Sequence, residues 1–86
     1  MELDELRKKI DVCDKKIVEA LVERFEIVGK IGEYKKQNNI PIVNKDREKI
    51  VIDKVKSLSE NRIPDVVIEK IYAAIISSAV LLENDL

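Results

Sequence analysis

One arginine of this chain stands at a position where the surrounding pattern calls for an apolar residue. Steps of three and four residues from Leu3 trace one face of a helix, on which Arg24 is the only charged residue. This apolar seam consists of Leu3, Leu6, Ile10, Cys13, Ile17, Ala20, Arg24, Ile27, Ile31 and Tyr34. A guanidinium in a low-dielectric interior is costly unless an opposite charge meets it. The sequence therefore predicts that a carboxylate of the protein or a bound anion lies against Arg24.

Two further cations are spaced so that they could meet the same anion. Lys35 follows Arg24 by eleven residues, close to three helical turns, so both share a face about 16 Å apart. The pair could enclose an anion of metabolite size, or Lys35 is simply solvated near the helix end. Arg7 lies about 25 Å before Arg24 and about 100° around the helix. It can reach the same ligand only from a second, antiparallel chain; otherwise it is a solvated arginine paired with Asp4 or Asp11.

Carboxylates on two later segments complete the set of charges that face inward. Glu48 shares a face with apolar residues and is either the partner of Arg24 or a carboxylate stabilised by a helix N-terminus. Its neighbour Arg47 is either solvated or lines a site. Glu83 follows apolar residues near a helix C-terminus, where the dipole and the surroundings both disfavour negative charge. If Glu83 faces inward, we expect it to be able to donate a hydrogen bond as the neutral acid; the alternative is an exposed last turn.

Three helices in one all-α domain, residues 1–86, are predicted to position these side chains. They span residues 3–37, 45–60 and 64–83. No proline precedes Pro41, and the residue before a proline avoids the α region, so the first helix ends shortly before it. Asn44 is the expected N-cap of the second helix, and Pro64 fits the first turn of the third.

The first predicted helix is too long for a globule of 86 residues. It would measure about 52 Å, whereas such a globule has a radius of gyration of about 12 Å. The two shorter helices could line the long one but could not surround it, so much of the apolar seam would stay exposed in a monomer. We therefore expect a homodimer intertwined through its long helices. A parallel coiled coil is the alternative, and the strongly apolar third helix argues against it.

The composition excludes several classes of function. A formal net charge of −1 and three aromatic residues provide neither a basic field nor a stacking platform for nucleic acid. One cysteine and no histidine argue against zinc sites, disulfides and histidine-dependent nucleophiles, and Cys13 is expected to be a small buried residue. No metal or cofactor is expected. No apolar run is long enough for a membrane and no signal peptide is present, so the expected location is the cytoplasm.

Several motifs taken together resemble the all-α, AroQ-type chorismate mutases. They are Arg7-Lys8-Lys9-Ile10-Asp11 with Asp14, Val22-Glu23-Arg24, Gly32-Glu33-Tyr34-Lys35, Ile40-Pro41-Ile42 and Asp46-Arg47-Glu48. The resemblance covers nearly the whole chain and implies an intertwined homodimer of three-helix chains whose active sites use residues of both subunits. It further implies an isomerase of the shikimate pathway, in aromatic amino acid biosynthesis. Such an enzyme converts chorismate to prephenate by a Claisen rearrangement, without cofactor or metal.

The resemblance implies roles for the residues nearest the reacting bonds. Arg24 and the Arg7 of the other subunit would bind the two carboxylates of chorismate. Lys35 would contact a carboxylate and the ether oxygen, and Glu83 would make the second contact to that oxygen. Glutamine is common at the position of Glu83, and only a neutral glutamate can donate to the ether oxygen. Activity is therefore expected to fall as rising pH ionises Glu83.

The resemblance also assigns the other end of the pocket. Glu48, with the region around Arg47, would hold the ring hydroxyl. Asn44 stands where aspartate is frequent, which preserves an N-cap and loses a charged contact. Ala79 stands where a small polar residue often lines the pocket, so a minor hydrogen bond is missing.

A pericyclic reaction suits a chain that has no histidine and no obvious base. Such a step needs a compact substrate conformer and positive charge where the breaking C–O bond becomes negative. Two other functions stay open on the sequence. One is isochorismate pyruvate lyase, which shares this fold and a similar cationic pocket. The other is a non-catalytic helical dimerisation or regulatory module, in which Arg24 is only a structural charge.

Overall fold

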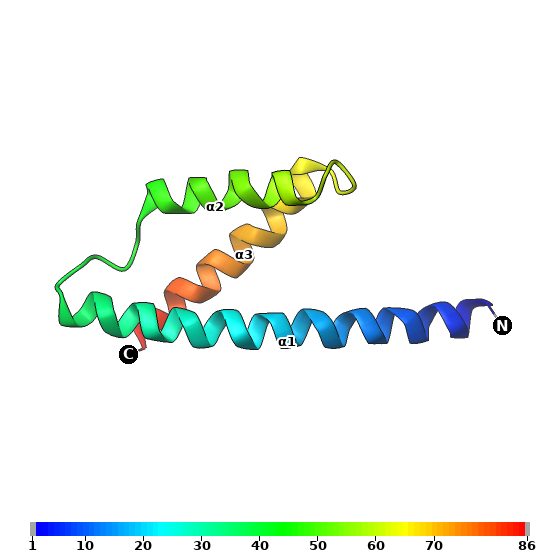
Figure 1. The fold of residues 1–86 in the computed structure, drawn as a ribbon, viewed down its shortest axis with the longest axis horizontal. Helices are drawn as coiled ribbons and strands as arrows, with labels where there is room; N and C mark the ends of the chain where they lie inside the picture. The colour runs from blue at the N-terminus through cyan, green and yellow to red at the C-terminus, as the bar shows by residue number, and fades with distance from the viewer. Residues whose placement is uncertain (1, 86) are drawn as a thin grey trace.

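The computed structural model describes residues 2–85, which form three helices and no strand. The helices are α1 (Glu2–Gln37), α2 (Lys45–Leu58) and α3 (Asp65–Asn84). Figure 1 shows α1 along the full length of the molecule and α2 on the other side of α3, which runs diagonally between them. The prediction of an all-α chain with one long and two shorter helices is confirmed.

The charges at both ends of α1 stabilise the helix, and a left-handed asparagine terminates it. Acidic residues occupy its first turn and lysines its last, in the order that the helix dipole favours. Asn39 adopts a left-handed conformation with φ 55°. The N–H of Ile40 then donates to the carbonyl of Lys35 at 2.8 Å, which closes the helix in a Schellman-type turn. The connection to α2 therefore leaves the helix in a fixed direction.

The boundaries of α2 and α3 agree with the prediction at one end and differ at two others. Asn44 is the N-cap of α2, and its Oδ1 accepts a hydrogen bond from the Arg47 N–H at 3.0 Å. The predicted extension of this helix to Glu60 is wrong by two residues. Glu60 and Asn61 adopt left-handed conformations, with φ of 52° and 61°, which an α-helix cannot continue through. Pro64 occupies the N-cap of α3, one residue before the first turn in which it was expected.

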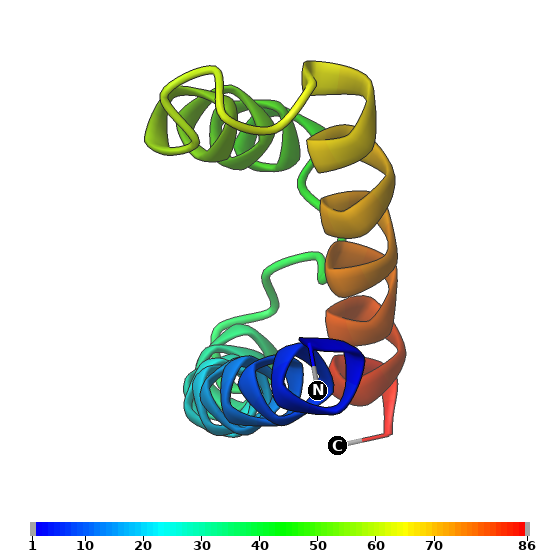
Figure 2. The same ribbon diagram turned by 90° about the vertical axis from the view of Figure 1, so that its right-hand side faces the viewer.

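The single chain is elongated and has almost no interior. Its extents are 56 × 24 × 15 Å and its radius of gyration is 15.8 Å, against about 12 Å for a globule of this length. Figure 2 shows why: α1 and α2 lie at opposite ends of α3, so the three helices form an open bracket. The buried residues that the structure describes include Val28, Ile68, Ala79 and Glu83. The core therefore lies mainly where α3 crosses α1.

The apolar seam of α1 is exposed over its N-terminal half. Leu3, Leu6, Ile10 and Ile17 each expose more than half of their surface, because α3 packs against the C-terminal part of α1 only. The prediction that this seam would be exposed in a monomer is confirmed. Cys13 was expected to be buried and is exposed in the single chain for the same reason. None of the described helices is both long and apolar enough to cross a membrane.

Candidate active site

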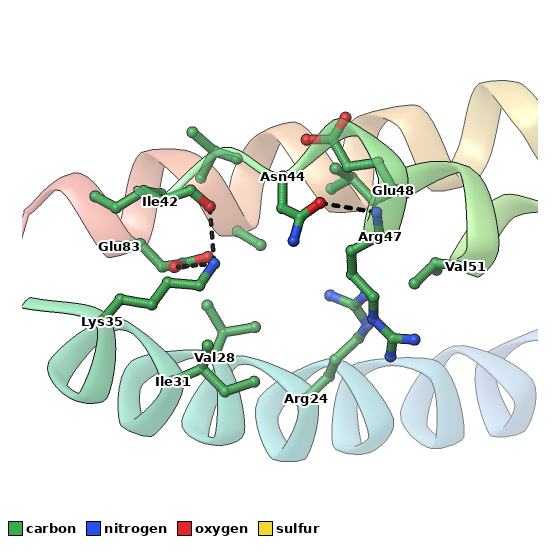
Figure 3. Close-up of a pocket in the computed structure, with 13 residues that line it drawn as sticks. Arg24, Val28, Ile31, Lys35, Ile42, Asn44, Arg47, Glu48, Val51 and Glu83 are labelled. Atoms are coloured by element: carbon green, nitrogen blue, oxygen red, sulfur yellow. Dashed lines mark hydrogen bonds and ion pairs between the residues drawn. The ribbon is translucent and has the colours of Figure 1, made fainter. Parts of the chain in front are cut away.

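A pocket of about 250 Å³ lies where the C-terminal half of α1, the start of α2 and the end of α3 come together (Figure 3). It is lined by seven of the residues singled out in the sequence: Arg24, Lys35, Asn44, Arg47, Glu48, Ala79 and Glu83. Aliphatic side chains of α1 and α3, including Val28, Ile31 and Ile76, form its walls. The pocket therefore combines several charged side chains with apolar walls.

Arg24 has no carboxylate partner among residues 2–85. Its Nη1 atom is buried and lacks a hydrogen-bond partner. Its guanidinium carbon lies 5.9 Å from the centre of the Tyr72 ring, within the range of a cation–π contact. Glu48, the candidate partner in the sequence, instead lies 3.5 Å from the Nζ of Lys45. The charge in the apolar seam is therefore supported by an aromatic face and is not neutralised by an acid.

Lys35 and Glu83 meet at the other end of the pocket. The Nζ of Lys35 donates a hydrogen bond to the carbonyl of Ile42 at 2.8 Å and lies 3.4 Å from Oε2 of Glu83. The side chain of Glu83 is only 8% exposed, yet its Oε2 has no hydrogen-bond partner. The two observations are compatible, because the 3.4 Å contact is an ion pair without hydrogen-bond geometry, and the ammonium makes its hydrogen bond to Ile42. A buried oxygen beside a cation is thus left with an unused acceptor site.

Arg47 and Asn44 reach the pocket from the start of α2. Figure 3 shows the side chains of Arg47 and Arg24 pointing into the space between α2 and α1. The amide nitrogen of Asn44 points into the same space, while its oxygen caps the helix. Two guanidinium groups that face one cavity without a carboxylate between them favour a bound anion.

Arg7 is not part of this pocket. It is exposed on α1, about 25 Å from Arg24 along the helix axis. No bend of α1 brings it closer, since the helix is continuous from Glu2 to Gln37. Within one chain, Arg7 and the pocket residues are therefore separate.

Two contributors to the site were missed in the sequence analysis. Tyr72 precedes Glu83 by eleven residues, the same spacing that separates Arg24 from Lys35. If Glu83 lies beside Lys35, this equal spacing places Tyr72 beside Arg24, so the sequence did contain a signal for the contact. The carbonyl of Ile42 belongs to the backbone of the α1–α2 connection, and no side-chain pattern could have indicated it. No group of His, Cys, Asp or Glu side chains within residues 2–85 is arranged to hold a metal ion.

Comparison with known proteins identifies relatives over nearly the whole chain. Residues 6–84 match the family model of chorismate mutase type II. A bifunctional chorismate mutase/prephenate dehydratase of Aquifex aeolicus is 37% identical over 96% of this chain, which spans 24% of that protein. A chorismate mutase of Methanocaldococcus jannaschii is 36% identical over 87% of this chain and 77% of its own length. A 4-amino-4-deoxychorismate mutase of Streptomyces pristinaespiralis is 26% identical over 96% of this chain and 65% of its own length.

Proposed function

The chain belongs to the chorismate mutase type II family, and on that premise we propose that it converts chorismate to prephenate by a Claisen rearrangement. One observation carries the proposal. Arg24, Arg47 and Lys35 face one cavity, and the buried Nη1 of Arg24 has no partner in the described part of the protein. A dicarboxylate substrate would supply the negative charge that meets the Arg24 guanidinium.

The binding groups hold chorismate in the compact conformer from which the rearrangement proceeds. Arg24 takes one carboxylate, for which its forked guanidinium is suited, and the Arg7 of a second chain takes the other. Glu48, with the region around Arg47, holds the ring hydroxyl. Apolar walls such as Val28 exclude extended conformers, so part of the barrier is met by orientation alone.

Lys35 and Glu83 act on the C–O bond that breaks. As this bond lengthens, negative charge develops on the ether oxygen, and the Nζ of Lys35 donates to it. Glu83 provides the second contact, and it can donate only while its carboxyl carries a proton. Because Lys35 and Glu83 lie 3.4 Å apart, one ether oxygen can contact both groups. No nucleophile and no net proton transfer are required, which suits this set of residues.

A homodimer with shared sites completes the proposal. The exposed apolar seam of α1 provides the surface for a second chain, since no described element of its own chain covers the N-terminal half. An antiparallel arrangement of two α1 helices would bring the Arg7 of each chain toward the Arg24 of the other. The substrate would then be enclosed by both subunits.

Subunit complementation tests this arrangement. Arg7→Ala and Arg24→Leu chains are expected to be inactive when prepared separately. When the two are co-refolded, the mixed dimer combines an intact Arg24 with an intact Arg7 in one of its sites, so activity returns. A mixture that stays as inactive as its components contradicts the shared site.

The reaction itself is tested by product identification. Incubation with chorismate is expected to yield prephenate, and incubation with isochorismate is expected to release no pyruvate. Pyruvate from isochorismate without prephenate from chorismate would establish isochorismate pyruvate lyase instead. The names of the relatives favour the mutase over that lyase and over a non-catalytic module.

A further inference from the structure

Asn44 presents a hydrogen-bond donor to the pocket, and its position at the start of α2 fixes this orientation. Its Oδ1 accepts a hydrogen bond from the N–H of Arg47 at 3.0 Å. A backbone N–H can only donate, so the oxygen of the amide must face the helix and the nitrogen must face away. Figure 3 shows this Nδ2 directed into the space between α2 and α1, in the pocket that Asn44 lines.

The surroundings of this donor are positively charged. The N-terminus of α2 carries the positive end of its helix dipole, and Arg24 and Arg47 line the same pocket. Glu48 is the acid of α2 that lines the pocket, but its carboxylate lies 3.5 Å from the Nζ of Lys45. A ligand group at this end of the pocket therefore meets hydrogen-bond donors and a positive potential. The carboxylate of Glu48 offsets this potential only in part, because Lys45 already pairs with it.

From this geometry we infer that Asn44 makes the pocket selective for a ring hydroxyl over a ring ammonium group. The inference rests on the proposed function. A hydroxyl oxygen has lone pairs and can accept the hydrogen bond that the Nδ2 of Asn44 offers. An amine on a saturated ring carbon is an ammonium at neutral pH, with three donors and no acceptor. Such an ammonium group would leave the Nδ2 of Asn44 without an acceptor, and it would be repelled by the positive charges of Arg24 and Arg47.

The contrast is chemically relevant because one relative of this chain is named for the amino compound, 4-amino-4-deoxychorismate. Hydroxyl and amino forms of the substrate differ at the group that we place beside Asn44. A site built to hydrogen-bond one partner rejects an analogue that leaves its polar groups unpaired. A change of preference between the hydroxyl and the amino substrate at Asn44 would leave Lys35 and Glu83, which act on the breaking C–O bond, unaltered.

Asn44→Asp is the informative substitution, because it reverses the polarity of the side chain without altering the helix start. Aspartate is an equally good N-cap, and one of its oxygens can take the hydrogen bond from Arg47. Its second oxygen then replaces Nδ2 and offers the pocket an acceptor with negative charge. Asn44→Ser is the matched control, because serine caps the helix but places no second polar atom in the pocket.

The experiment compares kcat/KM for chorismate and for 4-amino-4-deoxychorismate in wild type, Asn44→Asp and Asn44→Ser. Circular dichroism checks that each variant is folded. The quantity of interest is the ratio of kcat/KM for the amino substrate to kcat/KM for chorismate. We expect Asn44→Asp to raise this ratio by about tenfold or more over wild type, and Asn44→Ser to raise it by less.

Each result has a definite meaning. A ratio in Asn44→Asp that rises less than this, or that Asn44→Ser equals, overturns the donor assignment while wild-type turnover of chorismate upholds the proposed function. Absence of chorismate turnover in folded wild type contradicts the proposed function itself, and this inference with it. The two failures are thus distinguished by wild type alone.

Discussion

Two lysine–glutamate pairs tie α3 to its neighbours at opposite ends, and they differ in how well each charge is satisfied. Lys56 of α2 pairs directly with Glu69, near the start of α3, and we call this the hairpin pair. The hydrogen bond with Glu69 raises the pKa of Lys56 above its usual 10.5, although partial burial opposes the shift. In the pocket pair, Lys35 of α1 lies 3.4 Å from Glu83 and donates a hydrogen bond to the Ile42 carbonyl, while Oε2 of Glu83 has no hydrogen-bond partner.

The difference separates charges that serve the fold from charges that serve a ligand. The side chain of Glu69 is 48% exposed and that of Glu83 is 8% exposed. An exposed pair costs little to form and contributes little to stability. A buried pair with an unsatisfied atom is costly, and the fold alone gains nothing from it. We therefore expect substitutions at the pocket pair to lower activity, and substitutions at the hairpin pair to leave activity unchanged and to alter stability only slightly.

The largest contrast is expected from replacing each lysine in turn. Lys35→Met removes the cation that we propose acts on the breaking bond, and it should lower kcat/KM by about 10²–10³-fold or more with the helical circular dichroism spectrum retained. Lys56→Met is the matched control at the hairpin pair and should leave kcat/KM within about twofold, since it touches no substrate. Equal losses in both variants would remove the distinction between the pairs.

A pH dependence is expected next, and it concerns the acid of the pocket pair. Only the protonated form of Glu83 can donate to the ether oxygen, so wild-type kcat/KM is expected to be higher at low pH than at high pH. Glu83→Gln keeps a donor at every pH and should lose this fall. Profiles from about pH 5 to 9 for both proteins check the expectation. A flat wild-type profile, or a glutamine variant with the same fall, would sink the requirement for a neutral acid.

Tyr72 should give a smaller effect that separates its ring from its hydroxyl. Its ring lies 5.9 Å from the guanidinium carbon of Arg24, a contact that fixes the arginine without touching the reacting bond. Tyr72→Leu should raise KM by up to about tenfold with a smaller change in kcat, whereas Tyr72→Phe keeps the ring and should resemble wild type. If phenylalanine is as damaging as leucine, the ring contact is not what positions Arg24.

The smallest effect is expected on stability at the hairpin pair. The pKa of Lys56 is raised in the folded chain, so its contribution is fully present below the unfolded value of 10.5. It is lost as pH rises from there through the folded value. Lys56→Met should therefore lower the urea midpoint slightly at neutral pH, and the difference from wild type should shrink above pH 10.5. A difference that grows with pH would have the wrong sign.

Much of the fold could be predicted from the sequence because its signals are local. The three- and four-residue steps of α1 and the cap at Asn44 depend on neighbouring residues, and both predict the observed elements. The end of α2 was predicted two residues too late, since no glycine marks the left-handed conformations at Glu60 and Asn61. Local propensity sets such boundaries only weakly.

The pocket was predictable in its charges but not in its contacts. Spacing placed Arg24 and Lys35 on one face, and the inward position of Glu83 was one of two open possibilities. The pairing of Glu48 with Lys45 in place of Arg24 depends on how α2 sits over α1, which spacing within one helix cannot specify. The cation–π contact of Arg24 with Tyr72 is likewise a relation between helices. Residues that share a helix were therefore easier to place than residues that meet across helices.

The central claim is that the pocket charges serve a ligand and not the fold, and Arg24→Leu tests it most directly. The substitution completes the apolar seam and removes a buried nitrogen that has no partner in the described chain, so helical content and the unfolding midpoint should be retained or improved. Chorismate consumption should fall by more than about 10²-fold, because the substrate carboxylate that we propose Arg24 binds would lose its guanidinium partner. A folded Arg24→Leu protein that consumes chorismate at the wild-type rate would contradict the claim.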